Sequence, residues 1–233
     1  NQGGTPSPFD QSSHQSLSVA QSSADVRMEF IRKTYSLFMA GILVAIIAGT
    51  ICLQVPAILS LAAMIWSVPL VAIALMFGLT MGAEAVSRTE GLNYVALFGF
   101  TGFIGFLFAP ILALYAPQLL GTAAFLTTTI FGGLTAYVWV TKKDFNFLGG
   151  MLFVGLFALI VGGLANMFLF RSAGASYWMA WVTVVLFSGF VLYDTSQIIH
   201  RYDSKGYCSA ALSLFLDFFN MFMAILRILG GRR

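Results

Sequence analysis

Long apolar runs without a single charge, separated by short polar or proline-containing breaks, dominate this chain. No charge lies between Lys33 and Glu84, in Gly91–Thr141 or in Phe145–Phe170. Breaks within these runs fall at Gln54-Val55-Pro56 and Ala116-Pro117-Gln118. Since about 20 apolar residues cross a bilayer as a helix, the pattern predicts seven transmembrane helices, near residues 34–54, 57–82, 92–115, 119–140, 147–169, 177–199 and 208–229.

Composition agrees with this pattern. Of the 233 residues, 59% are hydrophobic and 9% are charged, whereas a soluble domain carries roughly 25% charged residues. Backbone groups cannot stay unpaired in lipid, so continuous apolar runs span a membrane as helices. The fold class is therefore an all-α membrane protein.

The first 26 residues differ from the rest of the chain. They are rich in Ser and Gln and lack the basic start and apolar core of a signal peptide. We expect residues 1–26 to form a disordered polar tail and residues 27–233 to form one transmembrane domain. The spacing of Ser22 and Asp25 is that of a capping box, which predicts a helix leading into the first span.

Basic residues are distributed unevenly between the two membrane faces. If seven helices alternate, eight Lys and Arg residues lie on one face and four on the other. The positive-inside rule then places the amino terminus in the cytoplasm. If the last helix did not cross, the count would be eleven against one, so the side of the carboxyl terminus stays open. The eight are Arg27, Arg32, Lys33, Arg88, Lys142, Lys143, Arg201 and Lys205.

Glycines at short spacings predict close helix packing. Gly78 and Gly82 form one such step in the second span, and Gly99, Gly102 and Gly105 share a face of the third. Small residues at these intervals let two helix backbones approach each other.

Two aspartates, Asp194 and Asp217, lie within the last two spans. A carboxylate at membrane depth costs at least a few kcal/mol, so it faces the bundle interior, takes a partner and marks a functional site. At 1.5 Å per residue, the two lie roughly 9 and 14 Å from the same cytoplasmic boundary. A short loop makes the two helices antiparallel neighbours, so we expect the two carboxyl groups to partner each other.

Polar residues accompany both aspartates. Ser209, Ser213 and Asn220 share a stripe with Asp217, while Gln197 and Arg201 continue the stripe of Asp194. Two carboxylates in a low-dielectric site share one proton and titrate as a pair, which is the behaviour of a pH switch. The alternative is that Ser, Asn or Arg satisfies each aspartate separately, with Arg201 as the strongest partner for Asp194.

Enzymatic activity is not indicated. Intramembrane aspartyl proteases carry Gly-x-Gly-Asp, whereas this chain has Leu214-Phe215-Leu216-Asp217, and the two leucines would obstruct a substrate backbone. The histidines, His14 and His200, lie outside the spans or at their boundary. No His/Cys cluster suggests a transition metal and no glycine-rich loop suggests a phosphate site. We expect no cofactor and no nucleic-acid partner.

The segments 191–199 (VLYDTSQII) and 213–220 (SLFLDFFN) resemble the transmembrane Bax inhibitor motif family, and the likeness extends over roughly residues 27–230. The resemblance implies seven helices, with two three-helix layers around a central carboxy-terminal helix. It also implies a pH-sensitive passive calcium leak governed by Asp194 and Asp217, which would bind the permeant calcium transiently.

The resemblance carries further expectations. Arg88 is the nearest candidate for an arginine that engages the pair in some members, and residues 57–83 offer no counterpart to an acidic residue of their second helix. The short tail and absent targeting signal are similar to those of a bacterial inner-membrane member. Some bacterial relatives are linked to a membrane-anchored ATP-dependent protease, so an adaptor that modulates such a protease is the second functional class.

Overall fold

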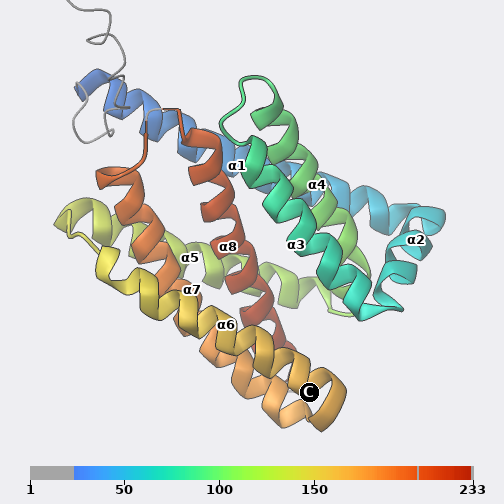
Figure 1. Ribbon diagram of the computed structural model, residues 1–233. Helices are drawn as coiled ribbons and strands as arrows, with labels where there is room; N and C mark the ends of the chain where they lie inside the picture. The colour runs from blue at the N-terminus through green and yellow to red at the C-terminus, as the bar shows by residue number, and fades with distance from the viewer. Residues whose placement is uncertain (1–23, 204, 232–233) are drawn as a thin grey trace, which may run out of the picture.

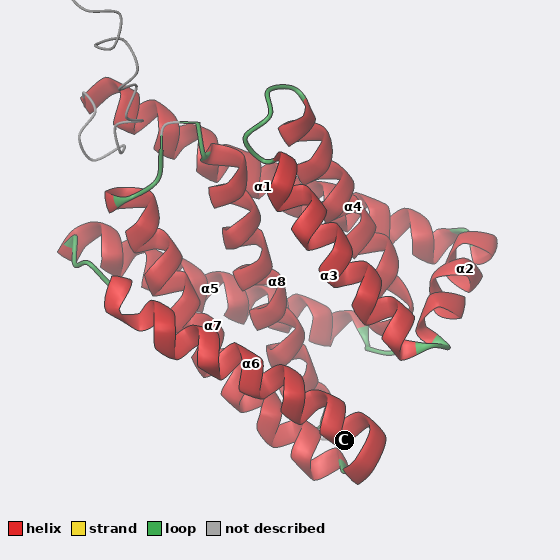
Figure 2. Cartoon of the chain, in the orientation of Figure 1, coloured by secondary structure: helices red, strands yellow, loops and turns green. Residues whose placement is uncertain are grey.

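Helices make up the regular structure of the part of the chain that the computed structural model describes, residues 24–203 and 205–231 (Figure 2). Most of the predicted polar tail, residues 1–23, lies outside the described residues. A 3₁₀ turn, η2 (Asn146–Leu148), precedes α6, and a π-helical turn, η3 (Asn166–Phe170), follows it. The α-helices are α1 (Ala24–Gln54), α2 (Pro56–Trp66), α3 (Pro69–Val86), α4 (Leu92–Leu112), α5 (Pro117–Thr141), α6 (Gly149–Ala165), α7 (Ala173–His200) and α8 (Tyr207–Gly230).

The predicted seven-helix membrane architecture is confirmed, because seven described helical segments are long and apolar enough to cross a bilayer. The prediction of one continuous helix over residues 57–82 is wrong. Two helices, α2 and α3, occupy this region, and the backbone leaves the helical conformation at Val68 (φ −121°, ψ 87°). Pro69 causes the break, since proline has no N–H to donate and disfavours helical conformation in the residue before it.

Helix α8 lies between two groups of helices (Figure 1). It packs against α1 and α4 on one side and against α5 and α7 on the other. On the first side α2 and α3 complete the group around α4, and on the second side α6 packs on α7. This grouping is compatible with the predicted two layers. In the most apolar stretch of α8, 50% of the residues are buried. In the corresponding stretch of the segment Asn146–Phe170, which contains α6, 6% are buried.

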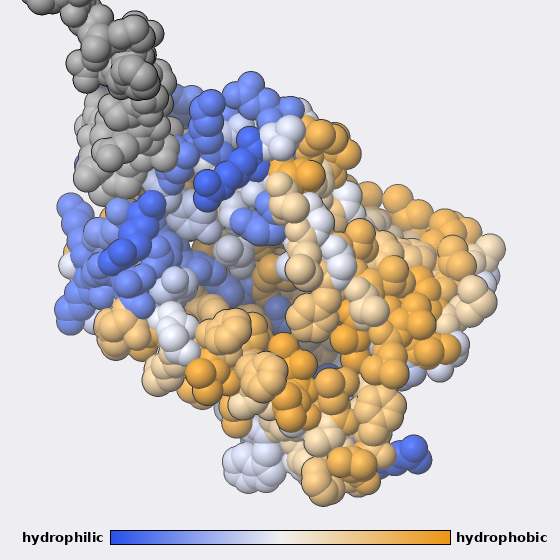
Figure 3. Space-filling model, viewed as in Figure 1, coloured by the Kyte–Doolittle hydropathy of each residue, from blue (hydrophilic) through white to orange (hydrophobic). Residues whose placement is uncertain are grey.

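The face of the molecule seen in Figure 3 has a hydrophilic end and a hydrophobic body. Hydrophilic residues gather over the connections α3–α4, α5–α6 and α7–α8, whereas hydrophobic residues cover most of the helix faces seen in this view. Large apolar side chains on these faces are well exposed, as at Val185 (72%) and Phe153 (70%). Such a surface suits lipid rather than water.

The backbones of α1 and α4 approach each other closely. An added Cβ atom on Gly105 would overlap the backbone of Ala45, and one on Gly102 would contact Val44 at 3.4 Å. The packing predicted for this glycine face is therefore confirmed at these two positions. It is wrong for Gly99 on the same helix and for Gly78 and Gly82, where an added Cβ would meet no described atom within 4 Å.

Gly105→Ala should destabilise the protein. The new methyl group cannot fit beside the Ala45 carbonyl unless α1 and α4 move apart, and overpacking of this kind costs about 1–3 kcal/mol. Gly99→Ala is the matched control, because its Cβ would face open space on the same helix. We expect a lower thermal unfolding midpoint in detergent for Gly105→Ala and an unchanged or higher one for Gly99→Ala. Equal midpoints for both variants would contradict this account of the contact.

Candidate functional site

The packing of α7 against α8 brings Asp194 and Asp217 together. A short connection after His200 reverses the chain, and the two carboxyl groups lie within hydrogen-bonding reach of each other. Asp217 is 3% exposed, and its Oδ2 accepts no hydrogen bond from a described donor. Asp194 is partly buried. The chain therefore places two adjacent carboxyl groups inside an apolar bundle.

A third carboxylate, Glu84, lies beside this pair. Ser209 on α8 donates a hydrogen bond of 2.6 Å to Oε1 of Glu84, and Glu84 is close enough for its charge to act on Asp194. We expected no acidic residue in the second span, on the basis of residues 57–83, and this expectation fails because the helix is longer than predicted. The predicted span ended at residue 82 because the charge-free run ends there, whereas α3 continues to Val86 and carries Glu84 in its last turn. The sequence has no glycine or proline between Gly82 and Gly91, and this could have indicated that the helix continues past residue 82.

Tyr202, in the connection between α7 and α8, also belongs to the site. Its phenol group lies within hydrogen-bonding reach of Ser213 and Ser209. Burial, with the neighbouring charge of Asp194, raises the pKa of Tyr202 to about 12. Tyr202 therefore stays protonated at neutral pH and can donate a hydrogen bond to the polar stripe of α8. Sequence reasoning placed Ser209 and Ser213 on that stripe but missed this phenol.

Gln197 and Arg201 do not reach the aspartate pair. Gln197 donates a hydrogen bond of 2.8 Å to Asn146, and Arg201 forms an ion pair of 2.9 Å with Asp144. Between them, the backbone N–H of Phe145 donates to Ser196 Oγ at 2.9 Å. The structure therefore does not contain the alternative Asp194–Arg201 pair. Instead, these residues attach the carboxy-terminal end of α7 to the α5–α6 connection.

Two further predicted residues also lie apart from the pair. The side-chain amide of Asn220 donates to the carbonyl of Leu216 in its own helix, at 2.8 Å. Arg88 is exposed and forms no ion pair with a described residue. The expectation that Arg88 engages the aspartates therefore has no contact to support it.

The carboxyl groups do not form a preformed metal site. Among the described residues, no three His, Cys, Asp or Glu side chains are arranged to hold a metal ion. A stable calcium site needs six to eight oxygen ligands, so Asp194 and Asp217 could contribute only part of such a shell. The arrangement is chemically suited to sharing a proton and to a brief contact with a cation.

Comparisons with known proteins agree with the fold. The model of the family described as "Inhibitor of apoptosis-promoting Bax1" matches residues 27–233. The chain is 32% identical to "Bax inhibitor 1" of Schizosaccharomyces pombe over 99% of its own length and 86% of that protein. It is 34% identical to mouse "Protein lifeguard 4", over 91% and 88%. It is also 34% identical to the Escherichia coli "Modulator of FtsH protease YccA", over 66% and 71%.

The Asp144–Arg201 ion pair should make stability depend on pH. The backbone N–H of Asn146, followed by the guanidinium of Arg201, holds the pKa of Asp144 below its ordinary value of 3.8. The pair therefore stabilises the fold above about pH 4, and this contribution is lost as pH falls through the lower, folded-state pKa. Since both side chains are about half exposed (49% and 47%), Asp144→Asn should cost about 0.2–1 kcal/mol at pH 7.

Thermal unfolding midpoints between pH 3 and 7 test this prediction. The Asp144→Asn variant should lose less stability on acidification than the parent protein. Glu90→Gln is the control, because the Glu90–Lys205 pair is longer, at 3.8 Å, and far more exposed. Parallel curves for the parent protein and Asp144→Asn would show that this ion pair contributes nothing.

Proposed function

This chain belongs to the Bax inhibitor family, and we propose that it is a pH-sensitive passive calcium leak governed by Asp194 and Asp217. The observation that carries the proposal is the pair itself, two carboxyl groups from neighbouring helices in contact inside an apolar bundle. An intramembrane carboxyl group is costly and by default marks an ion or proton pathway.

The chemistry of the pair supports a response to pH. With one shared proton, the two carboxyl groups can hold α7 and α8 together through a strong hydrogen bond. When both are ionised, they repel each other or attract a cation, and calcium prefers carboxylate oxygen. The proton count of the pair thus changes both the force between two helices and the affinity of the site for calcium.

The surroundings of the pair support a route from the polar end of the molecule. Glu84, Ser209 and Tyr202 continue from the aspartates towards the α7–α8 connection. These groups can hydrate or briefly bind a cation where the surrounding helices present apolar side chains. On this proposal the polar end faces the cytoplasm, with the amino terminus, in a bacterial inner membrane.

Asp194→Asn and Asp217→Asn should each flatten the pH dependence of calcium flux. Either amide abolishes the two-carboxyl titration while keeping the shape of the side chain. Because both changes remove the same coupled unit, the double variant should be little worse than either single variant. Calcium flux into proteoliposomes, measured between pH 5 and 8, provides the readout.

Asp25→Asn is the control for the loss of a carboxylate, since Asp25 lies in the first turn of α1 and is exposed. Its flux should keep the pH profile of the parent protein. If both single aspartate variants kept that profile as well, the pair would be structural and the leak proposal would be abandoned.

A second candidate function is modulation of a membrane-anchored ATP-dependent protease. The similarity to the Escherichia coli modulator of FtsH protease favours it. Removing residues 1–23, which precede α1, separates the two functions. A leak should retain its calcium flux in proteoliposomes without the tail, whereas an adaptor should lose its effect on degradation by a reconstituted protease.

A further inference from the structure

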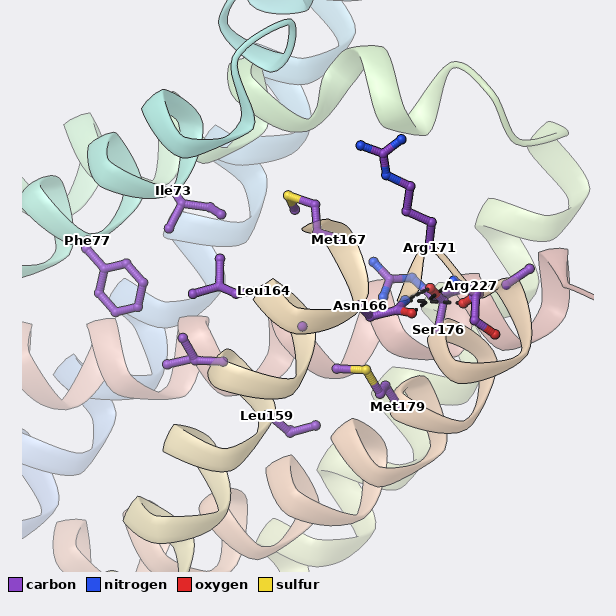
Figure 4. Close-up of a pocket in the computed structure, with 14 residues that line it drawn as sticks. Ile73, Phe77, Leu159, Leu164, Asn166, Met167, Arg171, Ser176, Met179 and Arg227 are labelled. Carbon is purple, nitrogen blue, oxygen red and sulfur yellow. Dashed lines mark hydrogen bonds between the residues drawn. The ribbon is translucent and has the colours of Figure 1, made fainter. Parts of the chain in front are cut away.

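A cavity of about 710 Å³ opens between α3 and α6, away from the aspartate pair. Ile73 and Phe77 of α3 line one wall, and Leu159 and Leu164 of α6 line the other (Figure 4). The face of the molecule that contains these helices is hollowed between them (Figure 3). The volume lies within the range of about 300–1,000 Å³ that small-molecule sites occupy.

One end of this cavity is basic. Arg171 and Arg227 both line it, and Figure 4 shows that both lie at the end remote from Ile73 and Phe77. Both residues are exposed, and neither forms an ion pair with any residue that the structure describes. The cavity therefore combines an apolar interior with two guanidinium groups that no described carboxylate neutralises.

A hydrogen-bonded turn between α6 and α7 positions Arg171. The α6 helix ends in the π-helical turn η3, and Arg171 follows it in the left-handed conformation (φ 48°), donating its N–H to the Asn166 carbonyl at 2.6 Å. Asn166 is 8% exposed and holds the start of α7 through hydrogen bonds to Ser172 and to Ser176. A non-glycine residue with positive φ is uncommon and needs such support.

We propose that this cavity binds an anionic phospholipid, with the phosphate at Arg171 and Arg227 and part of an acyl chain along the α3–α6 wall. Guanidinium groups bind phosphate through charge-assisted hydrogen bonds, and basic pockets between transmembrane helices bind anionic lipid headgroups. The residues that line the cavity also suit lipid, since Phe77 is 49% exposed and Met167 is 38% exposed. A water-soluble anion would gain nothing from the apolar wall. This inference does not depend on the leak proposal.

The competing explanation is that the two arginines only extend to the membrane surface, as arginines near helix ends commonly do. Purified protein would be titrated with phosphatidylglycerol and phosphatidylcholine of identical acyl chains, and bound lipid counted by native mass spectrometry. We expect a preference for phosphatidylglycerol. Arg171→Gln/Arg227→Gln should reduce that preference about tenfold, the equivalent of 1.4 kcal/mol, whereas Arg32→Gln, on the exposed face of α1, should preserve it.

A pair of neighbouring glycines tests the apolar wall. Gly163 lines the cavity and Gly162 does not, although a Cβ on either would make only ordinary contact with the flexible Met179 side chain, at 3.6 and 3.7 Å. Gly163→Leu should narrow the cavity and reduce binding of both lipids, and Gly162→Leu should leave binding unchanged. Thermal unfolding would verify that every variant is folded.

Excess inorganic phosphate distinguishes a lipid site from a simple anion site. We expect it to leave phosphatidylglycerol bound, because the acyl chain contributes to affinity. The proposal is overturned if phosphate displaces the lipid, if Gly163→Leu binds both lipids normally, or if the double arginine variant keeps the preference for phosphatidylglycerol.

Discussion

Enclosing a carboxyl group within a membrane requires protein on every side of it, and the arrangement of this bundle follows from that constraint. Asp217 is 3% exposed because α8 lies among α1, α4, α5 and α7. Aromatic rings complete the enclosure. Phe215 packs edge-on against Phe100 at 6.2 Å, and Phe218 lies between the rings of Phe38 and Phe131, at 5.9 and 5.6 Å. Because the enclosed helix α8 carries the polar stripe, the helices around it can expose apolar side chains to lipid.

The two helices that carry the aspartates are attached to different neighbours. The carboxy-terminal end of α7 is joined to the α5–α6 connection through Arg201, Gln197 and Ser196. The corresponding end of α8 is joined to α3 through Ser209 and Glu84. A change in the charge of the pair therefore acts between two groups of helices rather than between two free side chains. On the proposed function, these attachments would transmit a change in the charge of the pair to the helices on either side.

The sequence predicted the spans and the proximity of the two aspartates because both depend on simple regularities. Charge-free length sets the spans, and a short loop forces α7 and α8 to be neighbours. The remaining contacts could not be predicted in this way. Ending a helix at the first charge excluded Glu84, and treating a charge-free run as one helix overlooked the effect of Pro69. The partner of Arg201 is Asp144, 57 positions away, and neither spacing nor composition encodes such a contact between helices.

The family assignment constrains the fold more strongly than the function. Relatives that cover most of this chain carry names as different as "Bax inhibitor 1", "Golgi anti-apoptotic protein" and "Modulator of FtsH protease YccA". A shared fold does not imply a shared function, because function resides in particular sites. On the proposed function, a proton-dependent change in helix packing would open a path for calcium; on the second candidate function, it would alter a surface that a partner protein contacts. The leak proposal depends on the pair together with the polar groups that lead to it, Glu84, Ser209 and Tyr202, because an adaptor would need the change in packing but not a polar route to the surface.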